Sequence, residues 1–194
     1  KTRRQRQMCI RDSIIIGGGM SFTFIKALGG KIGSSIHEDS MTEKALSILE
    51  LAEHKNTKIH LPVDVVCAKE FKEGAESKIF AIDSISDEYE GLDSGPKSLE
   101  KFKKIIMSSK TILWNGPVGV FELESFSKGT KEIGKAISES TKSGAFSLVG
   151  GGDSVAAVKK FKLENEVSYV STGGGAMLES LEGKILPGIS ALKK

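Results

Sequence analysis

The chain has 194 residues, enough for one large domain with a substantial hydrophobic core. Its formal net charge is +3, but residues 1–13 hold five Lys and Arg against one Asp, so the other 181 residues sum to −1. With residues 14–194 so close to neutral, the chain offers no basic surface for nucleic acid. Its two cysteines cannot build a disulfide framework or a multi-cysteine zinc site. No apolar run approaches the roughly 18 residues that would predict a membrane span.

Residues 1–13 differ from the rest of the chain in charge and in pattern. They lack the hydrophobic segment of a secretory signal, which leaves a basic arm or part of a transit peptide as alternatives. We expect these residues to be a leader that is foreign to the domain, either disordered or an artefact of gene assembly. The folded domain is then expected to span residues 14–194.

After this leader the chain alternates short β-branched runs, glycines and segments with helical spacing. Six continuous apolar runs predict strands that are buried on both faces, at residues 14–16, 58–67, 78–82, 111–114, 145–149 and 167–171. Five further segments predict helices, at residues 40–55, 99–107, 126–142, 155–161 and 176–181. The alternation predicts the α/β class, with an open, doubly wound, Rossmann-like parallel sheet of about six strands and helices on both faces. Residues 83–96 show no periodicity and are expected to form a surface loop.

Three glycine triplets, at residues 17–19, 150–152 and 173–175, each follow a predicted strand and precede a predicted helix. Glycine permits tight turns and close approach of a ligand, and the unpaired N–H groups at the start of a helix attract anions. In a parallel sheet such turns meet at the carboxyl ends of the strands, where ligands bind. Any one triplet could equally be a tight structural turn, but three at one edge predict a polyphosphate ligand.

Residues 114–122 form a fourth segment that leaves a predicted strand. Pro117 and two glycines favour an unusual backbone path, and Asn115 and Glu122 could hydrogen-bond a ribose or a phosphate-bound water. An ordinary loop with a left-handed residue is an equal alternative for this segment alone.

Asp153 is the candidate metal ligand, because a carboxylate beside a phosphate-binding turn can hold a Mg²⁺ ion that bridges phosphates. The alternative is an N-cap for a helix that begins near Ser154, and the two roles are compatible.

Other chemistry-bearing residues receive no role from the sequence. His37, His54 and His60 show no ligand spacing, and Cys67 is expected in the core. The fingerprint Gly-x-Gly-x-x-Gly does not occur, and residues 129–135 imitate a P-loop only within a predicted amphipathic helix, so neither familiar nucleotide motif is indicated.

Taken together, six motifs resemble the phosphoglycerate kinase family in order and spacing. They are IIIGGGMSFTF (14–24), LPVDVV (61–66), GLDSGP (91–96), WNGPVGVFE (114–122), VGGGDS (149–154) and STGGGAMLESLEGKILPG (171–188). The resemblance covers residues 14–192 and concerns the C-terminal, nucleotide-binding domain of that family. It implies a glycolytic phosphoryl transfer, ATP + 3-phosphoglycerate ⇌ ADP + 1,3-bisphosphoglycerate, with 3-phosphoglycerate bound by an N-terminal domain.

The resemblance also implies roles for individual residues. Gly18, Gly19, Gly91 and Leu92 would line the adenine pocket, while Asn115, Pro117 and Val120 would flank the nucleotide and Glu122 would bind the ribose. Gly151, Gly152, Asp153 and Ser154 would hold phosphates, with Asp153 on Mg²⁺. Gly173, Gly174 and Gly175 would open a helix whose amides face the transferring phosphoryl group, and these three are the expected catalytic positions.

The chain departs from the family pattern at its start. The family has a Gly-Gly-Ala-Lys segment and a second lysine upstream of Ile16, and residues 1–13 match neither. We therefore expect a truncated or misassembled product that binds ATP or ADP but is inactive alone. By the same resemblance the protein is expected to be monomeric and cytoplasmic. The alternative is a non-catalytic, stand-alone nucleotide-binding module with a basic leader.

Overall fold

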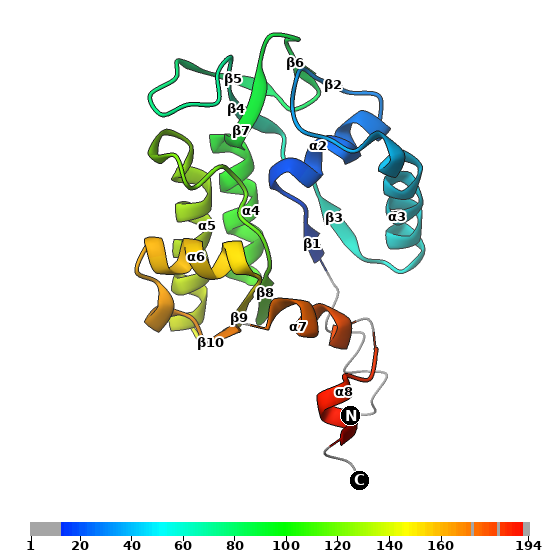
Figure 1. Ribbon diagram of the computed structural model, residues 1–194, viewed down its shortest axis with the longest axis vertical. Coiled ribbons are helices and arrows are strands. Elements are labelled where there is room, and N and C mark those ends of the chain that lie inside the picture. The colour runs from blue at the N-terminus through cyan, green and yellow to red at the C-terminus, as the bar shows by residue number, and fades with distance from the viewer. Residues whose placement is uncertain (1–12, 172, 182, 192–194) are drawn as a thin grey trace.

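The structure, a computed structural model, describes residues 13–171, 173–181 and 183–191, so that residues 1–12 of the expected leader lie outside the described part. Its helices are α2 (Gly18–Ala27), α3 (Thr42–His54), α4 (Pro96–Ser108), α5 (Lys128–Lys142), α6 (Gly152–Lys160), α7 (Gly174–Leu181) and α8 (Pro187–Ala191), together with the short 3₁₀ turns η1 (Asp39–Met41), η2 (Glu124–Phe126) and η3 (Glu164–Glu166). Its strands are β1 (Ser13–Ile15), β2 (Lys31–Ile32), β3 (Lys58–His60), β4 (Asp64–Ala68), β5 (Ser77–Ala81), β6 (Ser84–Ile85), β7 (Glu90–Ser94), β8 (Thr111–Trp114), β9 (Phe146–Gly150) and β10 (Tyr169–Ser171). Figure 1 shows how these elements are arranged.

Parallel strands alternate with helices, which confirms the α/β class. Strand β1 pairs with β3, and β8, β9 and β10 form a second parallel ladder in the order β10-β9-β8. These two ladders do not pair with one another, so the strands expected in one sheet are divided between them. The segments α4, α5 and α6 lie beside the β8–β10 ladder, while α2 and α3 lie beside β1 and β3 (Figure 1).

Each ladder has its own hydrophobic core. The larger core joins Phe102 of α4, Ile137 of α5 and Val158 of α6 to Trp114 and Val149 at the ends of β8 and β9. The smaller core packs α2 and α3 against β1 and β3. Helical spacing of apolar residues therefore identified the helix faces that pack against the strands.

The single strand expected at residues 58–67 is wrong, because the chain forms two strands there. β3 is parallel to β1, whereas β4 is antiparallel to both β5 and β7. Pro62 lies between them, and a proline has no N–H to donate to a strand ladder. The expected buried parallel strand at 78–82 is likewise wrong, since β5 is an antiparallel partner of β4 with mostly exposed side chains.

The surface loop expected at residues 83–96 is also wrong. Strand β7 runs through it, and Leu92, Asp93 and Ser94 are buried. Buried strands are usually predicted from apolar runs. The sequence of β7, EGLDS, is mostly polar, so no strand was predicted there.

Two other expectations are confirmed. Residues 129–135 lie inside α5, so this segment resembles a P-loop in sequence but does not form one. Cys67 is fully buried, and burial raises the pKa of its thiol to about 12, so the residue is a core side chain without a reactive thiolate at neutral pH. None of the helices in the described part of the chain has the length and hydropathy needed to cross a membrane.

Candidate functional site

The loop after β8, residues 115–122, is the meeting point of the glycine turns. A Cβ atom added to Gly18 would lie 2.9 Å from the carbonyl oxygen of Pro117, and one added to Gly151 would clash with the amide of Asn115. Both glycines also have a positive φ, +60° and +94°, which other residues rarely adopt. Glycine is therefore required at these two turns by backbone conformation and by close packing on one loop.

The third glycine turn reaches the same place through Gly174. A Cβ atom there would clash with the backbone of Gly151, so α7 begins directly against the turn that opens α6. Gly173 and Gly175 on either side are exposed. The ends of β1, β8, β9 and β10 thus carry contiguous turns, as expected for the carboxyl edge of a parallel sheet.

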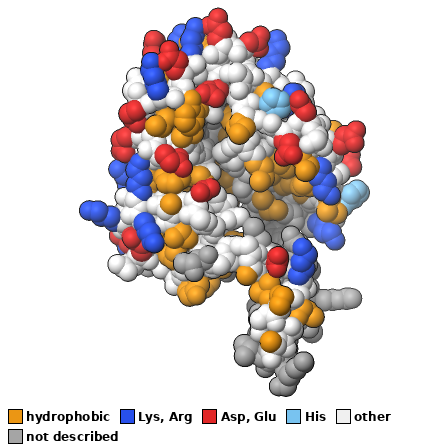
Figure 2. Space-filling view, in the orientation of Figure 1, with side chains coloured by type: hydrophobic (Ala, Val, Ile, Leu, Met, Phe, Trp, Pro, Cys, Tyr) orange, Lys and Arg blue, Asp and Glu red, His pale blue; other side chains and the backbone are white. Residues whose placement is uncertain are grey.

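A cavity of about 400 Å³ opens beside this junction, which is a volume typical of small-molecule pockets. Its lining combines the start of α2, strands β4 and β7, and the loop after β8. The four residues expected in the adenine pocket line it, namely Gly18, Gly19, Gly91 and Leu92, and so do Pro117 and Val120, which were expected to flank the nucleotide. In Figure 2 the Lys and Arg side chains lie mostly around the outline of the face, whereas several Asp and Glu side chains lie further in, among apolar and uncharged surface.

The remaining expected residues lie outside this cavity, toward α6 and α7. Asn115 and Glu122 are exposed at the two ends of the loop, and Gly152 and Asp153 are exposed in the first turn of α6. The open N–H groups and the dipole of this helix end favour an anion. An elongated ligand with an apolar end in the cavity and an anionic end at α6 fits this layout.

Ser154 has a different environment from its neighbours. It is fully buried, and its Oγ accepts a 2.6 Å hydrogen bond from the backbone N–H of Gly116. The hydroxyl therefore joins α6 to the loop after β8.

The capping alternative for Asp153 is wrong. The N-cap of α6 is Gly151, and no side chain caps this helix. Asp153 is thus an exposed carboxylate in the first turn of α6. In the described parts of the chain no three His, Cys, Asp or Glu side chains gather to hold a metal, so Mg²⁺ here would depend on phosphate oxygens and water for its other ligands. These residues fit a metal ion that arrives with a nucleotide.

Asp93 lines the cavity and was not expected there, because its segment was assigned to a surface loop. Its carboxylate accepts hydrogen bonds from the backbone N–H groups of Ser94, at 2.8 Å, and Gly129, at 2.7 Å. Burial nevertheless dominates and raises the pKa of Asp93 to about 7. Gly129 opens α5, so Asp93 connects the cavity wall to that helix. No spacing in the sequence marks it.

Ile36, in the segment 33–38, is another cavity-lining residue that the sequence did not indicate. Ile36 is 71% exposed and lines the cavity above Gly19. Ser35 is buried beneath it and accepts a 2.9 Å hydrogen bond from the N–H of Gly91 on β7.

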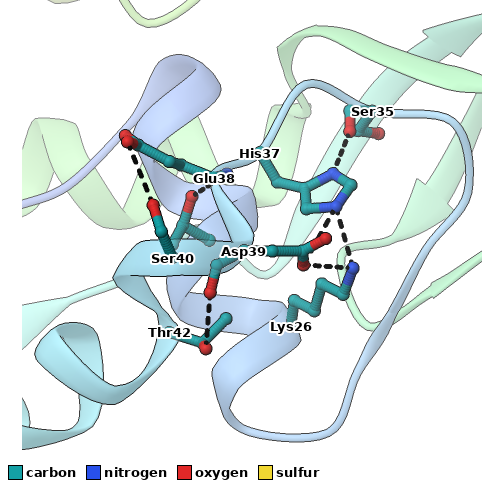
Figure 3. A network of polar contacts seen from close by, with 8 residues as sticks. Lys26, Ser35, His37, Glu38, Asp39, Ser40 and Thr42 are labelled. Atoms are coloured by element: carbon teal, nitrogen blue, oxygen red, sulfur yellow. Dashed lines mark hydrogen bonds and ion pairs between the residues drawn. The ribbon is translucent and has the colours of Figure 1, made fainter.

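A polar network holds the same segment from the other side (Figure 3). Lys26 of α2 contacts His37, at 2.8 Å, and Asp39, at 2.6 Å, and His37 also contacts the carbonyl oxygen of Ser35. The hydrogen bond from Lys26 lowers the pKa of Asp39. His37 therefore helps to hold the segment that contains Ile36, although its sequence spacing indicates no metal site.

Comparison with known proteins agrees with this architecture. The family model described as phosphoglycerate kinase matches residues 6–184. The phosphoglycerate kinase of Porphyromonas gingivalis is 54% identical over 182 residues, which cover 94% of this chain and 44% of that protein. The phosphoglycerate kinase of Thermosipho africanus is also 54% identical over 182 residues, covering 93% of this chain and 45% of that protein.

Solved structures give the same result. The structure of phosphoglycerate kinase from Coxiella burnetii superposes with a TM-score of 0.90 at 44% identity, covering 97% of this chain and 48% of that one. The enzyme from Pyrococcus horikoshii gives a TM-score of 0.73 at 32% identity, over 98% of this chain and 46% of that one. The chain thus spans slightly less than half the length of these relatives. By sequence and by structure, the chain belongs to the phosphoglycerate kinase family.

Proposed function

We propose that this chain is the nucleotide-binding half of a phosphoglycerate kinase, which transfers a phosphoryl group between ATP and 3-phosphoglycerate. The observation that carries the proposal is the 400 Å³ cavity lined by the loop after β8, because the same loop contacts Gly151 and Ser154 at the start of α6, and Gly174 of α7 packs on Gly151. An apolar recess next to two anion-favouring helix ends matches a nucleotide, whose base is flat and weakly polar and whose phosphates are charged.

The nucleotide lies across the loop after β8 in this proposal. Its adenine occupies the cavity between Gly18, Gly91 and Val120, and its ribose lies toward Glu122. Its phosphates reach Gly151, Gly152 and Asp153 at the start of α6. Ser154 contributes by fixing the loop, because its buried oxygen accepts the hydrogen bond from the N–H of Gly116.

Phosphoryl transfer depends on positioning and on charge stabilisation rather than on covalent catalysis. Mg²⁺, when bound with the nucleotide, neutralises charge between the phosphate groups, and Asp153 is the residue that holds it. Gly173, Gly174 and Gly175 present the backbone N–H groups of α7 to the transferring group. The acceptor, 3-phosphoglycerate, is supplied by the other half of the family's protein, and the monomeric state and the cytoplasmic location are part of the same proposal.

The test is calorimetry with Mg-ADP on the 194-residue chain, followed by a coupled kinase assay on the same sample. We expect weak binding without turnover, because a γ-phosphate cannot react in line with an acceptor that is not held. The affinity for inorganic pyrophosphate alone should be lower than that for Mg-ADP, since the cavity is then unused. Absence of Mg-ADP binding by the folded chain contradicts the proposed site, and turnover by this chain alone contradicts the proposed division of labour.

A further inference from the structure

Helix α6 holds the loop after β8 at both of its ends. In its first turn, Ser154 accepts the hydrogen bond from the N–H of Gly116. In its last turn, Lys160 donates to the carbonyl oxygens of Phe121, at 2.7 Å, and Glu122, at 3.1 Å. These two contacts are six residues apart, or about 9 Å along a helix. One rigid helix therefore spans the loop from its beginning to its end.

The surroundings of Lys160 make these contacts strong. Its side chain is 35% exposed, and its third neighbour is the carboxylate of Glu124, at 3.9 Å. An ammonium group has three N–H donors, and hydrogen bonds from a charged donor are shorter and stronger than neutral ones. The Lys160 ammonium group can thus donate to two carbonyl oxygens and contact one carboxylate at the same time.

Other contacts also hold the loop, including its end, where the Phe121 side chain is buried in the larger core and the N–H of Leu123 donates to the carbonyl oxygen of Val120 at 3.2 Å. Val118 is held through its N–H by Thr130 and through its carbonyl by Ser94, and Val120 donates to the carbonyl of Leu92 at 2.8 Å. Beyond that point the backbone carbonyls of the next two residues both face Lys160. The carbonyl oxygen of Glu122 itself is therefore held by Lys160 of α6, in addition to the contacts that hold its two neighbours.

We propose that Lys160 is a positioning residue for the ribose of the bound nucleotide, acting through the backbone of Glu122. The inference rests on the proposed function, in which Glu122 binds the ribose hydroxyls. Glu122 is exposed, so its backbone must be ordered for its carboxylate to meet a ribose without further loss of entropy. Lys160 does this while lying at the opposite end of α6 from the phosphate-binding turn.

The test compares ADP with 2′,3′-dideoxy-ADP, which lacks both ribose hydroxyls, by calorimetry on the 194-residue chain. Wild type should bind ADP about tenfold more tightly than the dideoxy compound, the equivalent of one good polar contact. Lys160→Met should weaken ADP binding about tenfold and leave dideoxy-ADP binding within about twofold. Glu122→Gln should behave in the same way, and the double variant should lose no more than either single one.

Controls separate positioning from a general loss of structure. Lys160→Arg retains charged donors and should keep the preference for ADP. Lys159→Met, at an exposed neighbour in the same turn, should bind both compounds as wild type does. If Lys160→Met does not fold, as judged by circular dichroism, Lys160→Gln replaces it.

The outcomes distinguish the ribose role of Glu122 from the positioning role of Lys160. A wild-type chain without any preference for ADP overturns the ribose role of Glu122, and with it the proposed site. If Glu122→Gln abolishes the preference for ADP over the dideoxy compound but Lys160→Met keeps it, only the inference about Lys160 is overturned. Equal weakening of both compounds by Lys160→Met also overturns it, because a lysine that only supports the fold affects the base and phosphate contacts as much as the ribose.

Discussion

The buried hydroxyl of Ser154 and the backbone N–H of Gly116 are joined by a 2.6 Å hydrogen bond between helix α6 and the loop after β8. These residues are 38 positions apart, and each belongs to a different glycine-containing turn. The bond fixes the loop that lines the cavity relative to the helix end that favours phosphate. Stability and ligand binding are therefore expected to separate in variants of this region.

Ser154→Ala tests that structural role. The substitution leaves a buried N–H without an acceptor, so the free energy of unfolding should fall by about 1–3 kcal/mol. Urea denaturation measures this loss, with Ser190→Ala at an exposed position as the control. Unchanged stability together with lost ADP binding contradicts the role, because it identifies the hydroxyl as a direct phosphate ligand.

Asp153→Ala separates metal binding from folding. Asp153 makes no capping hydrogen bond and contributes to stability only as an acidic residue in the first turn of α6, so stability should fall by less than about 1 kcal/mol. In a protein of full family length that carries this chain, the activation barrier should rise by on the order of 3 kcal/mol, because the metal acts on charge that develops during transfer. The variant should therefore have a much lower kcat. Binding of ADP without Mg²⁺ should change less than kcat. A near-wild-type kcat contradicts the assignment of the metal to Asp153.

Gly152→Asp tests the anion site at α6. A Cβ atom at Gly152 meets no neighbour, and an acidic residue in a first helical turn is favourable, so the variant should fold normally. Its negative charge should repel the phosphates and weaken ADP binding by at least about tenfold. Gly152→Asn adds similar bulk without the charge and should bind more tightly than Gly152→Asp. Equal affinities of the two variants contradict an electrostatic origin.

The raised pKa of Asp93 predicts a pH dependence of stability. Burial raises this pKa from 3.8 to about 7, so the folded protein keeps a proton that the unfolded chain has already released. Stability from this group is present at low pH and is lost as pH rises from about 4 to about 7, by on the order of 4 kcal/mol.

Comparison with Asp93→Asn isolates this effect, because other carboxylates titrate equally in both proteins. Urea denaturation at pH 5 and at pH 8 should show a smaller loss of stability for the variant than for wild type. Asp87→Asn, at an exposed position, should follow wild type. Parallel pH profiles of wild type and Asp93→Asn contradict the assignment.

The sequence predicted the strands that carry the glycine turns, and it predicted α6 and α7, which follow two of them, but none of its helix ranges covered α2 (Gly18–Ala27). Hydrophobic runs and helical spacing are local patterns, and β1, β8, β9 and β10 lie within a residue or two of the runs that predicted them. The family itself was indicated by the motifs, and the comparison confirms it.

The walls of the cavity escaped sequence reasoning for the opposite reason. Strand β7 is buried because Gly91 packs against the ring of Phe22 and because Asp93 accepts a hydrogen bond from the N–H of Gly129, and both partners are distant in sequence. Ile36 belongs to the cavity because Lys26 and His37 hold its segment over α2.

By itself, therefore, the sequence determined the class of fold, the positions of the glycine turns and the family. Each of these depends on residues that are close together in the chain or on long sequence motifs. Only the tertiary structure decided that strands divide into separate ladders, that Ser154 and Lys160 secure the loop after β8, and that a buried carboxylate lies in the cavity wall. Those properties depend on which distant groups become neighbours when water is excluded, and packing alone settles that.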